Sequence, residues 1–151
     1  RGTAFRISLP LVAAGVASPR PDAVLPGPSL RGRLALVIEN DDAMRLAYQL
    51  MLRERLGMVV RVSGGTAEAL AVMGDEPPDA VIADYNLDND DTGLQAIRAL
   101  RAAAGQAVPA ILVSARRDPE ISRASLELGV PMLEKPIRPE ELQLVLQRIL
   151  A

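Results

Sequence analysis

The chain has 151 residues, enough for one domain of ordinary size with a sizeable core. With 49% hydrophobic residues, 24% charged residues and a net charge of -2, it has the balance of a soluble globular protein without the basic surface that nucleic acid requires. The aromatic content of 2% leaves no stacking platform for single-stranded nucleic acid. The sequence contains no Cys and no His, which excludes disulfides, thiolate or imidazole metal sites and His-based catalytic triads. Any metal ion must therefore be bound by oxygen, as Mg²⁺, Mn²⁺ and Ca²⁺ are.

The first 32 residues differ in composition from the rest. Residues 1–10 alternate apolar and polar side chains, which predicts a half-buried strand that ends at Pro10. Residues 11–32 are rich in Pro, Ala, Gly and Ser, which is typical of a linker. Because the chain starts with Arg, we expect it to be an internal piece of a longer protein, and the apolar run after Leu9 only superficially resembles a signal peptide. No apolar run is long enough to span a bilayer, so no direct membrane contact is expected.

From residue 33 the chain alternates short apolar runs with segments of helical periodicity. The expected strands are 34–38, 58–62, 80–83, 109–113 and 130–133. The helices expected after them are 42–56, 66–73, 93–104, 118–128 and a last one that opens at 138–140. Thr66 and Asp118 stand where N-caps are expected, and Gly57 where a helix should end. Five strand–helix pairs predict an α/β fold with a parallel sheet, helices on both faces and right-handed crossovers.

Polar groups follow four of the five expected strands. In chain order they are Glu39, Asn40 and Asp41, then Asp84, then Ser114, then Lys135. Because the carboxyl ends of parallel strands share one edge of a sheet, these groups should converge on one cleft. Their oxygens can hold Mg²⁺, Asp84 can act as a nucleophile towards phosphorus, and Ser114 and Lys135 can donate to phosphoryl oxygens. Taken alone, Asp84 could equally cap its loop and Ser114 could be a capping serine.

At these positions the chain resembles the receiver domain of two-component response regulators. The matching segments are Glu39–Asp41, Val81–Asp84, Ser114 and Lys135–Pro136, in the family's order along residues 33–151. The resemblance implies a CheY-like, flavodoxin-like (βα)5 fold, a doubly wound parallel sheet of five strands in the order 2-1-3-4-5.

The same resemblance implies the function. Asp84 would accept a phosphoryl group from phosphohistidine, with Ser114 and Lys135 as its catalytic partners. The implied ligands of Mg²⁺ or Mn²⁺ are Glu39, Asn40, Asp84 and the backbone carbonyl of Asn86, with Asp41 as a further candidate. The partners would be a phosphohistidine domain of a histidine kinase, a histidine phosphotransfer protein, or both, and the resemblance leaves a homodimer open. A cytoplasmic location is expected.

Further motifs resemble the C-terminal receiver of a hybrid sensor histidine kinase. They are Val37–Asp41, Asp84–Asp88 and Thr92–Leu94, while residues 2–10 resemble the last strand of a histidine kinase ATP-binding domain. This implies that residues 1–10 are a remnant of that domain, 11–32 a linker and 33–151 the receiver. The parent chain would be a protein-histidine kinase, which a membrane could anchor, while this piece would perform at most its own phosphorylation and dephosphorylation.

Two positions depart from the family pattern. The family usually has two acidic residues where this chain has Glu39-Asn40, so we expect weaker Mg²⁺ binding than with two carboxylates, unless Asp41 takes part. Asn40 could instead be only a helix cap. Met132 stands where the family often has an aromatic switch residue, and could equally be ordinary core. Asn86 and Arg116 occupy positions that in the family tune the loss of the phosphoryl group, although Arg116 could simply be a solvated loop residue.

Three other functions are alternatives to the phosphoacceptor. A degenerate receiver that only binds partners is the first alternative, favoured by Asn40 and Met132. A phosphohydrolase that uses an aspartyl phosphate needs a second Asp two residues after the nucleophile, where this chain has Asn86. A flavin-binding flavodoxin is disfavoured because the loop after the first strand is acidic where a phosphate would bind.

Overall fold

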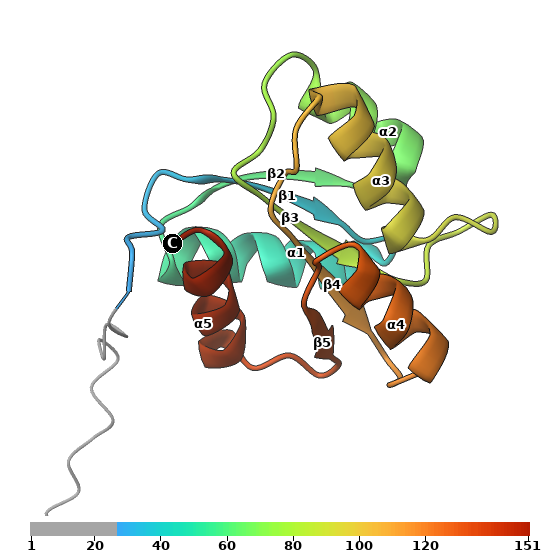
Figure 1. The fold of residues 1–151 in the computed structure, drawn as a ribbon. Coiled ribbons are helices and arrows are strands. Elements are labelled where there is room, and N and C mark those ends of the chain that lie inside the picture. The colour runs from blue at the N-terminus through green and yellow to red at the C-terminus, as the bar shows by residue number, and fades with distance from the viewer. Residues whose placement is uncertain (1–26) are drawn as a thin grey trace, which may run out of the picture.

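The computed structural model describes residues 27–151, so the strand expected over 1–10 and most of the expected linker lie outside the described residues. The strands are β1 (Leu34–Ile38), β2 (Val59–Ser63), β3 (Ala80–Asp84), β4 (Ala110–Ser114) and β5 (Met132–Glu134). The helices are α1 (Asp42–Leu50), continued by the π-helix η1 (Met51–Arg55), α2 (Thr66–Met73), α3 (Gly93–Ala104), α4 (Pro119–Glu127) and α5 (Pro139–Ile149). All strand pairs are parallel in the order β2-β1-β3-β4-β5, which confirms the predicted flavodoxin-like topology (Figure 1).

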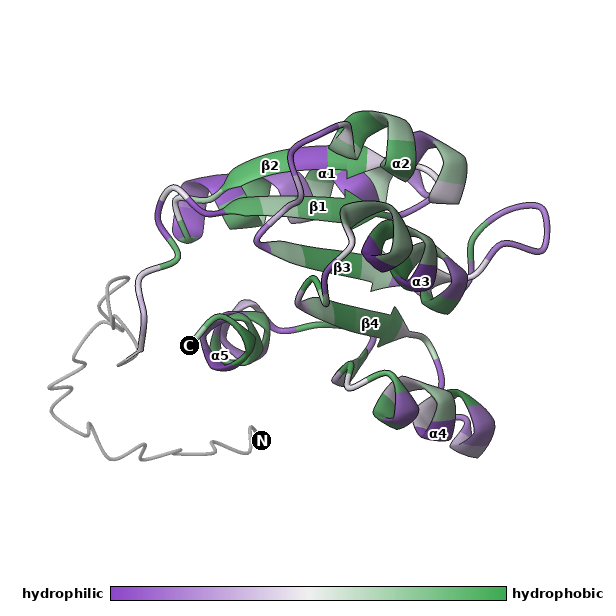
Figure 2. Ribbon diagram, turned by 45° about the horizontal axis from the view of Figure 1, so that its top comes forward, coloured by the Kyte–Doolittle hydropathy of each residue, from purple (hydrophilic) through white to green (hydrophobic). Residues whose placement is uncertain are grey.

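The sheet lies between two layers of helices, and the side chains of alternate strand residues point towards opposite layers. In β1, Ala35 and Val37 pack towards α1, η1 and α5, while Leu36 and Ile38 pack towards α2 and α3. The strands β1, β3 and β4 are buried along their whole length, as a parallel sheet covered on both faces requires. Figure 2 shows these strands as hydrophobic and the loop between β3 and α3 as hydrophilic. In these three strands, polar side chains therefore stand only at the carboxyl end, as Asp84 and Ser114 do.

The expected helix caps are partly confirmed. Asp118 caps α4, and the predicted end at Gly57 coincides with a left-handed residue after η1. The N-cap of α2 is Gly65 rather than Thr66, and the acceptor for the Thr66 backbone N–H is the carboxylate of Asp91, from the loop after β3. The expectation for Thr66 was wrong because a residue distant in sequence supplies this cap.

The buried face of the first helix differs from the one its periodicity suggested. The spacing of Met44, Ala47, Leu50 and Met51 predicts one apolar stripe along this helix, but the exposed fractions of Met44 and Leu50 are 38% and 51%. Tyr48 and Leu52 are the buried residues instead. Because this helix carries apolar side chains on several faces, helical periodicity alone does not predict which face is buried. The π-helix η1 also has wider turns than an α-helix, which changes the spacing of the residues that face the core.

The segment just before β1 packs beside α5. Leu30 is buried with the residues that pack between the sheet and α1 and α5, and the backbone oxygen of Pro28 accepts a hydrogen bond from Gln147. Among residues 27–151, every helix is too short or too polar to cross a membrane.

Candidate functional site

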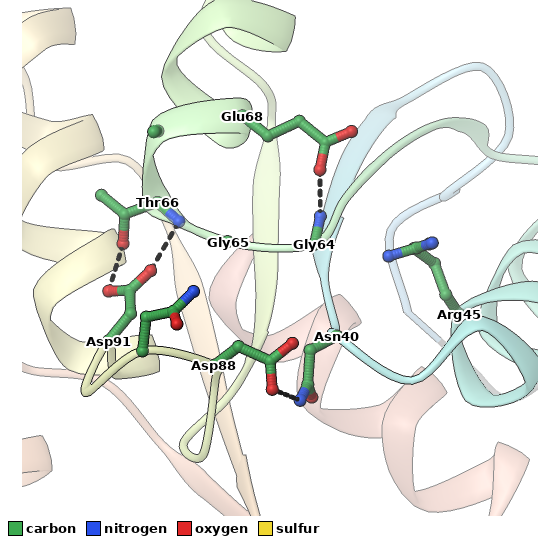
Figure 3. A pocket seen from close by; sticks show the side chains of 10 residues that line it. Asn40, Arg45, Gly64, Gly65, Thr66, Glu68, Asp88 and Asp91 are labelled. Atoms are coloured by element: carbon green, nitrogen blue, oxygen red, sulfur yellow. Dashed lines mark hydrogen bonds between the residues drawn. The ribbon is translucent and has the colours of Figure 1, made fainter.

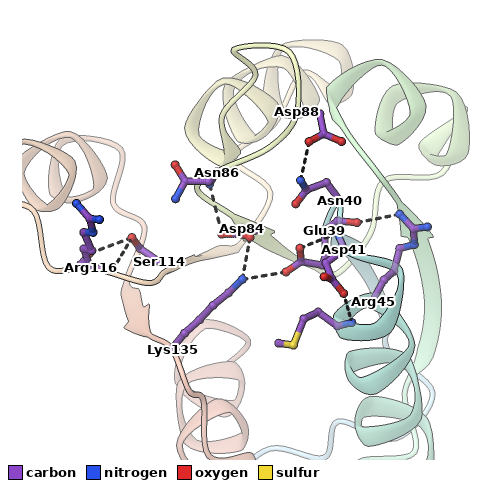
Figure 4. A network of polar contacts seen from close by, with 11 residues as sticks. Glu39, Asn40, Asp41, Arg45, Asp84, Asn86, Asp88, Ser114, Arg116 and Lys135 are labelled. Atoms are coloured by element: carbon purple, nitrogen blue, oxygen red, sulfur yellow. Dashed lines mark hydrogen bonds and ion pairs between the residues drawn. The ribbon is translucent and has the colours of Figure 1, made fainter.

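Three charged side chains meet at the carboxyl edge of the sheet. Asp84 is the last residue of β3, and the pairing of Ile38 with Ala83 places Glu39 beside it. The Nζ of Lys135, just past β5, lies 2.8 Å from Oδ2 of Asp84 and 3.1 Å from Oε2 of Glu39 (Figure 4). Both carboxylates are nearly enclosed, with 1% of Glu39 and 7% of Asp84 exposed. The predicted convergence of these three residues is thus present.

Lys135 is the only lysine in the sequence, and every other basic residue is an arginine. An ammonium is compact enough to lie between two carboxylates and has three donors that can be redirected. The planar guanidinium of Arg is bulkier and has a fixed donor geometry. Lysine therefore suits a position where one cation contacts both Glu39 and Asp84.

The three groups alter each other's proton affinity. Burial raises the pKa of Glu39; the hydrogen bonds from Asp41 and Lys135 oppose this rise and the negative charge of Asp84 adds to it. Burial alone would lower the pKa of Lys135, but hydrogen bonds and charge attraction from Asp84 and Glu39 raise it above its ordinary value. Lys135 is therefore held firmly in its charged form.

Asn40 lies beside this network and is bonded to the loop after β3. Its amide Nδ2 donates to Oδ1 of Asp88 at 2.9 Å. Asn40 is not the cap of α1, because Asp41 has that role: its carboxylate accepts a hydrogen bond from the backbone N–H of Met44 at 2.9 Å. The backbone N–H of Asp41 in turn donates to Oε1 of Glu39 at 3.0 Å.

The donors at this edge fit a hard divalent cation. Glu39 and Asp84 offer carboxylate oxygens and Asn40 a neutral amide oxygen, the ligand types that Mg²⁺ prefers. The backbone N–H of Asn86 donates to Oδ1 of Asp84 at 3.3 Å, so the chain turns back over the carboxylate and carries the backbone of Asn86 to the same edge. In the part of the chain that the structure describes, no three His, Cys, Asp or Glu side chains form a metal-binding group. A cation here would rely on two carboxylates completed by neutral oxygens.

Ser114 ends β4 on the other side of Asp84, but its hydroxyl is bonded within its own loop. Its Oγ donates to the backbone oxygen of Arg116 at 2.9 Å and accepts from the backbone N–H of the same residue at 3.3 Å. The structure thus brings Ser114 to the predicted edge without joining it to the Asp84 network (Figure 4). Met132, the expected switch position, is half-buried against the core on the α2–α3 side of the sheet.

A surface hollow of about 490 Å³ adjoins this site (Figure 3). Asp91 accepts hydrogen bonds from the backbone N–H of Thr66 at 2.7 Å and from its Oγ1 at 2.6 Å. The guanidinium of Arg45 donates to the backbone oxygen of Glu39 at 2.9 Å. The residues that line the hollow are Asn40, Arg45, Gly64, Gly65, Thr66, Ala67, Glu68, Asp88, Asn89 and Asp91. The sequence alone indicates no role for Asp88 or Asp91, because their hydrogen-bond partners lie on other elements.

Gly93 fixes the backbone next to Asp84. It is the first residue of α3, and its backbone N–H donates to the oxygen of Tyr85 at 3.0 Å. A Cβ at this position would lie 2.4 Å from the backbone oxygen of Asp84 and 2.9 Å from Leu112 Cδ1. Only glycine therefore allows α3 to start so close to the end of β3.

Comparison with known proteins agrees with this geometry. The family model for the response regulator receiver domain matches residues 35–147. No curated protein sequence matched the chain. Among solved structures, the receiver domain of a Pseudomonas aeruginosa sensor histidine kinase, with magnesium coordinated in its active site cleft, is 30% identical; the match covers 79% of this chain and 98% of that one, with a TM-score of 0.68. Chemotaxis protein CheY4 of Vibrio cholerae is 25% identical over 78% of this chain and 98% of its own, with a TM-score of 0.70.

The family match spans most of the chain and includes β1, β3, β4 and β5, the strands whose ends carry Glu39, Asp84, Ser114 and Lys135. The strand order and the polar edge described above agree with it. The chain therefore belongs to the family of response regulator receiver domains of two-component signalling.

Proposed function

We propose that this receiver accepts a phosphoryl group from phosphohistidine onto Asp84 in a Mg²⁺-dependent reaction. The observation that carries the proposal is the contact of Lys135 with both Asp84 and Glu39 at the open edge of the sheet. Family membership supplies the reaction class, and this contact supplies the carboxylate and the cation that the reaction needs.

In the proposed step, a carboxylate oxygen of Asp84 attacks phosphorus. The new O–P bond forms as the P–N bond to the donor imidazole breaks, giving an aspartyl phosphate. Mg²⁺, when bound, would offset the charge on the phosphoryl oxygens. Lys135 keeps its proton and donates to a phosphoryl oxygen, which its raised pKa favours. Glu39, Asn40, Asp84 and the backbone carbonyl of Asn86 would hold the metal.

The wider context belongs to the same proposal. One similar structure is the receiver of a sensor histidine kinase, and this supports a hybrid kinase as the parent of the present chain. In that arrangement residues 1–10 end the ATP-binding domain, 11–32 link it to the receiver, and the parent is a protein-histidine kinase. The donor or acceptor partner is a phosphohistidine domain or a histidine phosphotransfer protein, and the reaction takes place in the cytoplasm.

Intact-protein mass spectrometry with a small acyl phosphate donor tests the phosphoacceptor. With Mg²⁺ we expect a gain of one phosphoryl group that hydroxylamine removes, and no gain with a chelator. Asp84→Asn should abolish the label. Asp90→Asn is the matched control, because it removes one exposed carboxylate from the neighbouring loop and should label as wild type does. Label that survives Asp84→Asn would falsify the assignment of the acceptor.

A receiver that acts only by binding a partner is the second candidate, and Asn40 is the observation that favours it. The same experiment separates the two. If no variant takes up label at any Mg²⁺ concentration while the protein stays folded, the interaction module is the better description.

A further inference from the structure

The contact between Asn40 and Asp88 fixes which way the Asn40 amide faces. An ionised carboxylate has acceptors only, so the group that Asn40 turns towards Oδ1 of Asp88 must be its NH2, at 2.9 Å. The amide oxygen is then turned away from Asp88, on the side of Asp84 (Figure 4). Asp88 thereby decides that an oxygen rather than an NH2 faces the cation site.

Without this contact, nothing in the described hydrogen bonds of Asn40 would select that orientation. The terminal torsion of Asn is broad and roughly two-fold, so both amide orientations are accessible to a free side chain. In the reversed orientation the NH2 would face the site and could not ligate a cation. We infer that Asp88 is a positioning residue that presents the carbonyl oxygen of Asn40 to the cation beside Asp84.

The loop that carries Asp88 is anchored, which is what positioning requires. The backbone oxygen of Asp88 accepts from the N–H of Asp91 at 3.2 Å, and that of Asp91 accepts from the N–H of Leu87 at 3.2 Å. The side chain of Asp91 is bonded twice to Thr66 at the start of α2. Asp88 is exposed, but its backbone is fixed at both ends of this turn.

The same geometry predicts that a carboxylate at position 40 would not by itself improve cation binding. Asn40→Asp would bring a second carboxylate to hydrogen-bond distance from Asp88, where like charges repel. The new side chain would turn away or remain protonated, and either response costs metal affinity. Exchanging the two residues would restore the hydrogen bond with its roles reversed, because Asn at position 88 can donate to Asp at position 40.

The inference rests on the proposed Mg²⁺-dependent function and is tested by calorimetric titration of the folded 151-residue chain with Mg²⁺. We expect Asp88→Ala to weaken binding about tenfold, as loss of the partner of a metal ligand typically does. Asp88→Asn keeps an acceptor for Asn40 and should stay within about threefold of wild type, since it loses only an exposed charge. The control Asp90→Asn removes a charge from the same loop and should also stay within about threefold. Thermal unfolding midpoints of all variants should match, because these side chains lie on the surface.

The exchange gives an independent measurement. Asn40→Asp alone should bind Mg²⁺ no more tightly than wild type, whereas Asn40→Asp with Asp88→Asn should bind about tenfold more tightly, since it adds a carboxylate ligand without the repulsion. Asp88→Ala and Asp90→Asn with equal affinities, or Asn40→Asp alone binding as tightly as the exchanged pair, would overturn the role of Asp88 and leave the proposed function standing. A wild-type protein that binds no Mg²⁺ would overturn both.

Discussion

The charged side of the Asp84 site and its hydroxyl side are organised differently. On the charged side, Lys135 from beyond β5 contacts both Asp84 and Glu39, which lie 51 and 96 positions before it in the chain. On the hydroxyl side, the hydroxyl of Ser114 at the end of β4 bonds to the backbone of Arg116, two positions away. The first arrangement depends on the assembled sheet, whereas the second is a local turn of the loop after β4.

This difference separates the contacts around Asp84 that are already formed from those that would have to change. Under the proposed function, the charged groups are already in contact around Asp84, so the first side would need little reorganisation when a phosphoryl group arrives. Ser114 would have to give up its hydrogen bonds to Arg116 before it could donate to a phosphoryl oxygen. The following predictions test that asymmetry.

Replacing Lys135 should have the largest effect. Lys135→Arg keeps the positive charge but changes the donor geometry between Glu39 and Asp84, and we expect the initial rate of phosphorylation to fall about 100-fold, the typical loss when one preorganised donor is removed. Labelling rates at saturating donor, measured by intact mass, check this. Arg138→Lys, which alters an exposed basic residue near by, should label at the wild-type rate. A Lys135→Arg rate close to wild type would mean that charge alone is required.

Gly93→Ala should come next, because it disturbs the backbone that both sides share. The new Cβ would meet the backbone oxygen of Asp84 at 2.4 Å, and we expect a loss of about 2–3 kcal/mol in the free energy of unfolding from overpacking. Urea denaturation measures it. Gly105→Ala is the control: it has open space around it but a φ of 64°, and should cost about 1 kcal/mol. Equal losses for the two variants would contradict the close packing of α3 on β3.

The pKa of Lys135 reports directly on the charged side. It should lie above its ordinary value of 10.5 and fall in Asp84→Asn and in Glu39→Gln, since each removes a partner that raises it. With ¹³Cε-labelled lysine the chain gives one signal, which can be titrated without assignment. Because the folded-state pKa is raised, the stabilisation from this cation is fully present below about pH 10.5 and is lost as the pH rises through the folded-state value. An unchanged pKa in both variants would show that the contacts do not form in solution.

Ser114→Ala should have the smallest effect of the four. Because the hydroxyl is bonded to Arg116 in the structure, its loss should slow phosphorylation by less than about tenfold, well below the cost of disturbing Lys135. Single-turnover labelling compares the two variants directly. A loss as large as that of Lys135→Arg would mean that Ser114 donates in the reactive state as fully as Lys135 does.

Much of the fold was encoded locally. The buried strands are continuous apolar runs, and Asp118-Pro119 carries its helix-start signal in adjacent residues, so period and capping chemistry sufficed to place them. The meeting of Glu39, Asp84 and Lys135 was also predictable, because parallel strands in a doubly wound sheet bring their carboxyl ends to one edge. Resemblance to a family then supplied the strand order and the reaction class.

The tertiary structure decided which partner each polar side chain takes. The pairing of Asn40 with Asp88, the cap of α2 by Asp91 and the turn of Ser114 towards Arg116 depend on how loops from different strands meet. The buried face of α1 was likewise settled by packing of Tyr48 against the sheet rather than by the helical period. A sequence fixes which groups stand at the strand ends through local periodicity, whereas hydrogen bonds between loops are chosen by distances and directions that exist only after the sheet has formed.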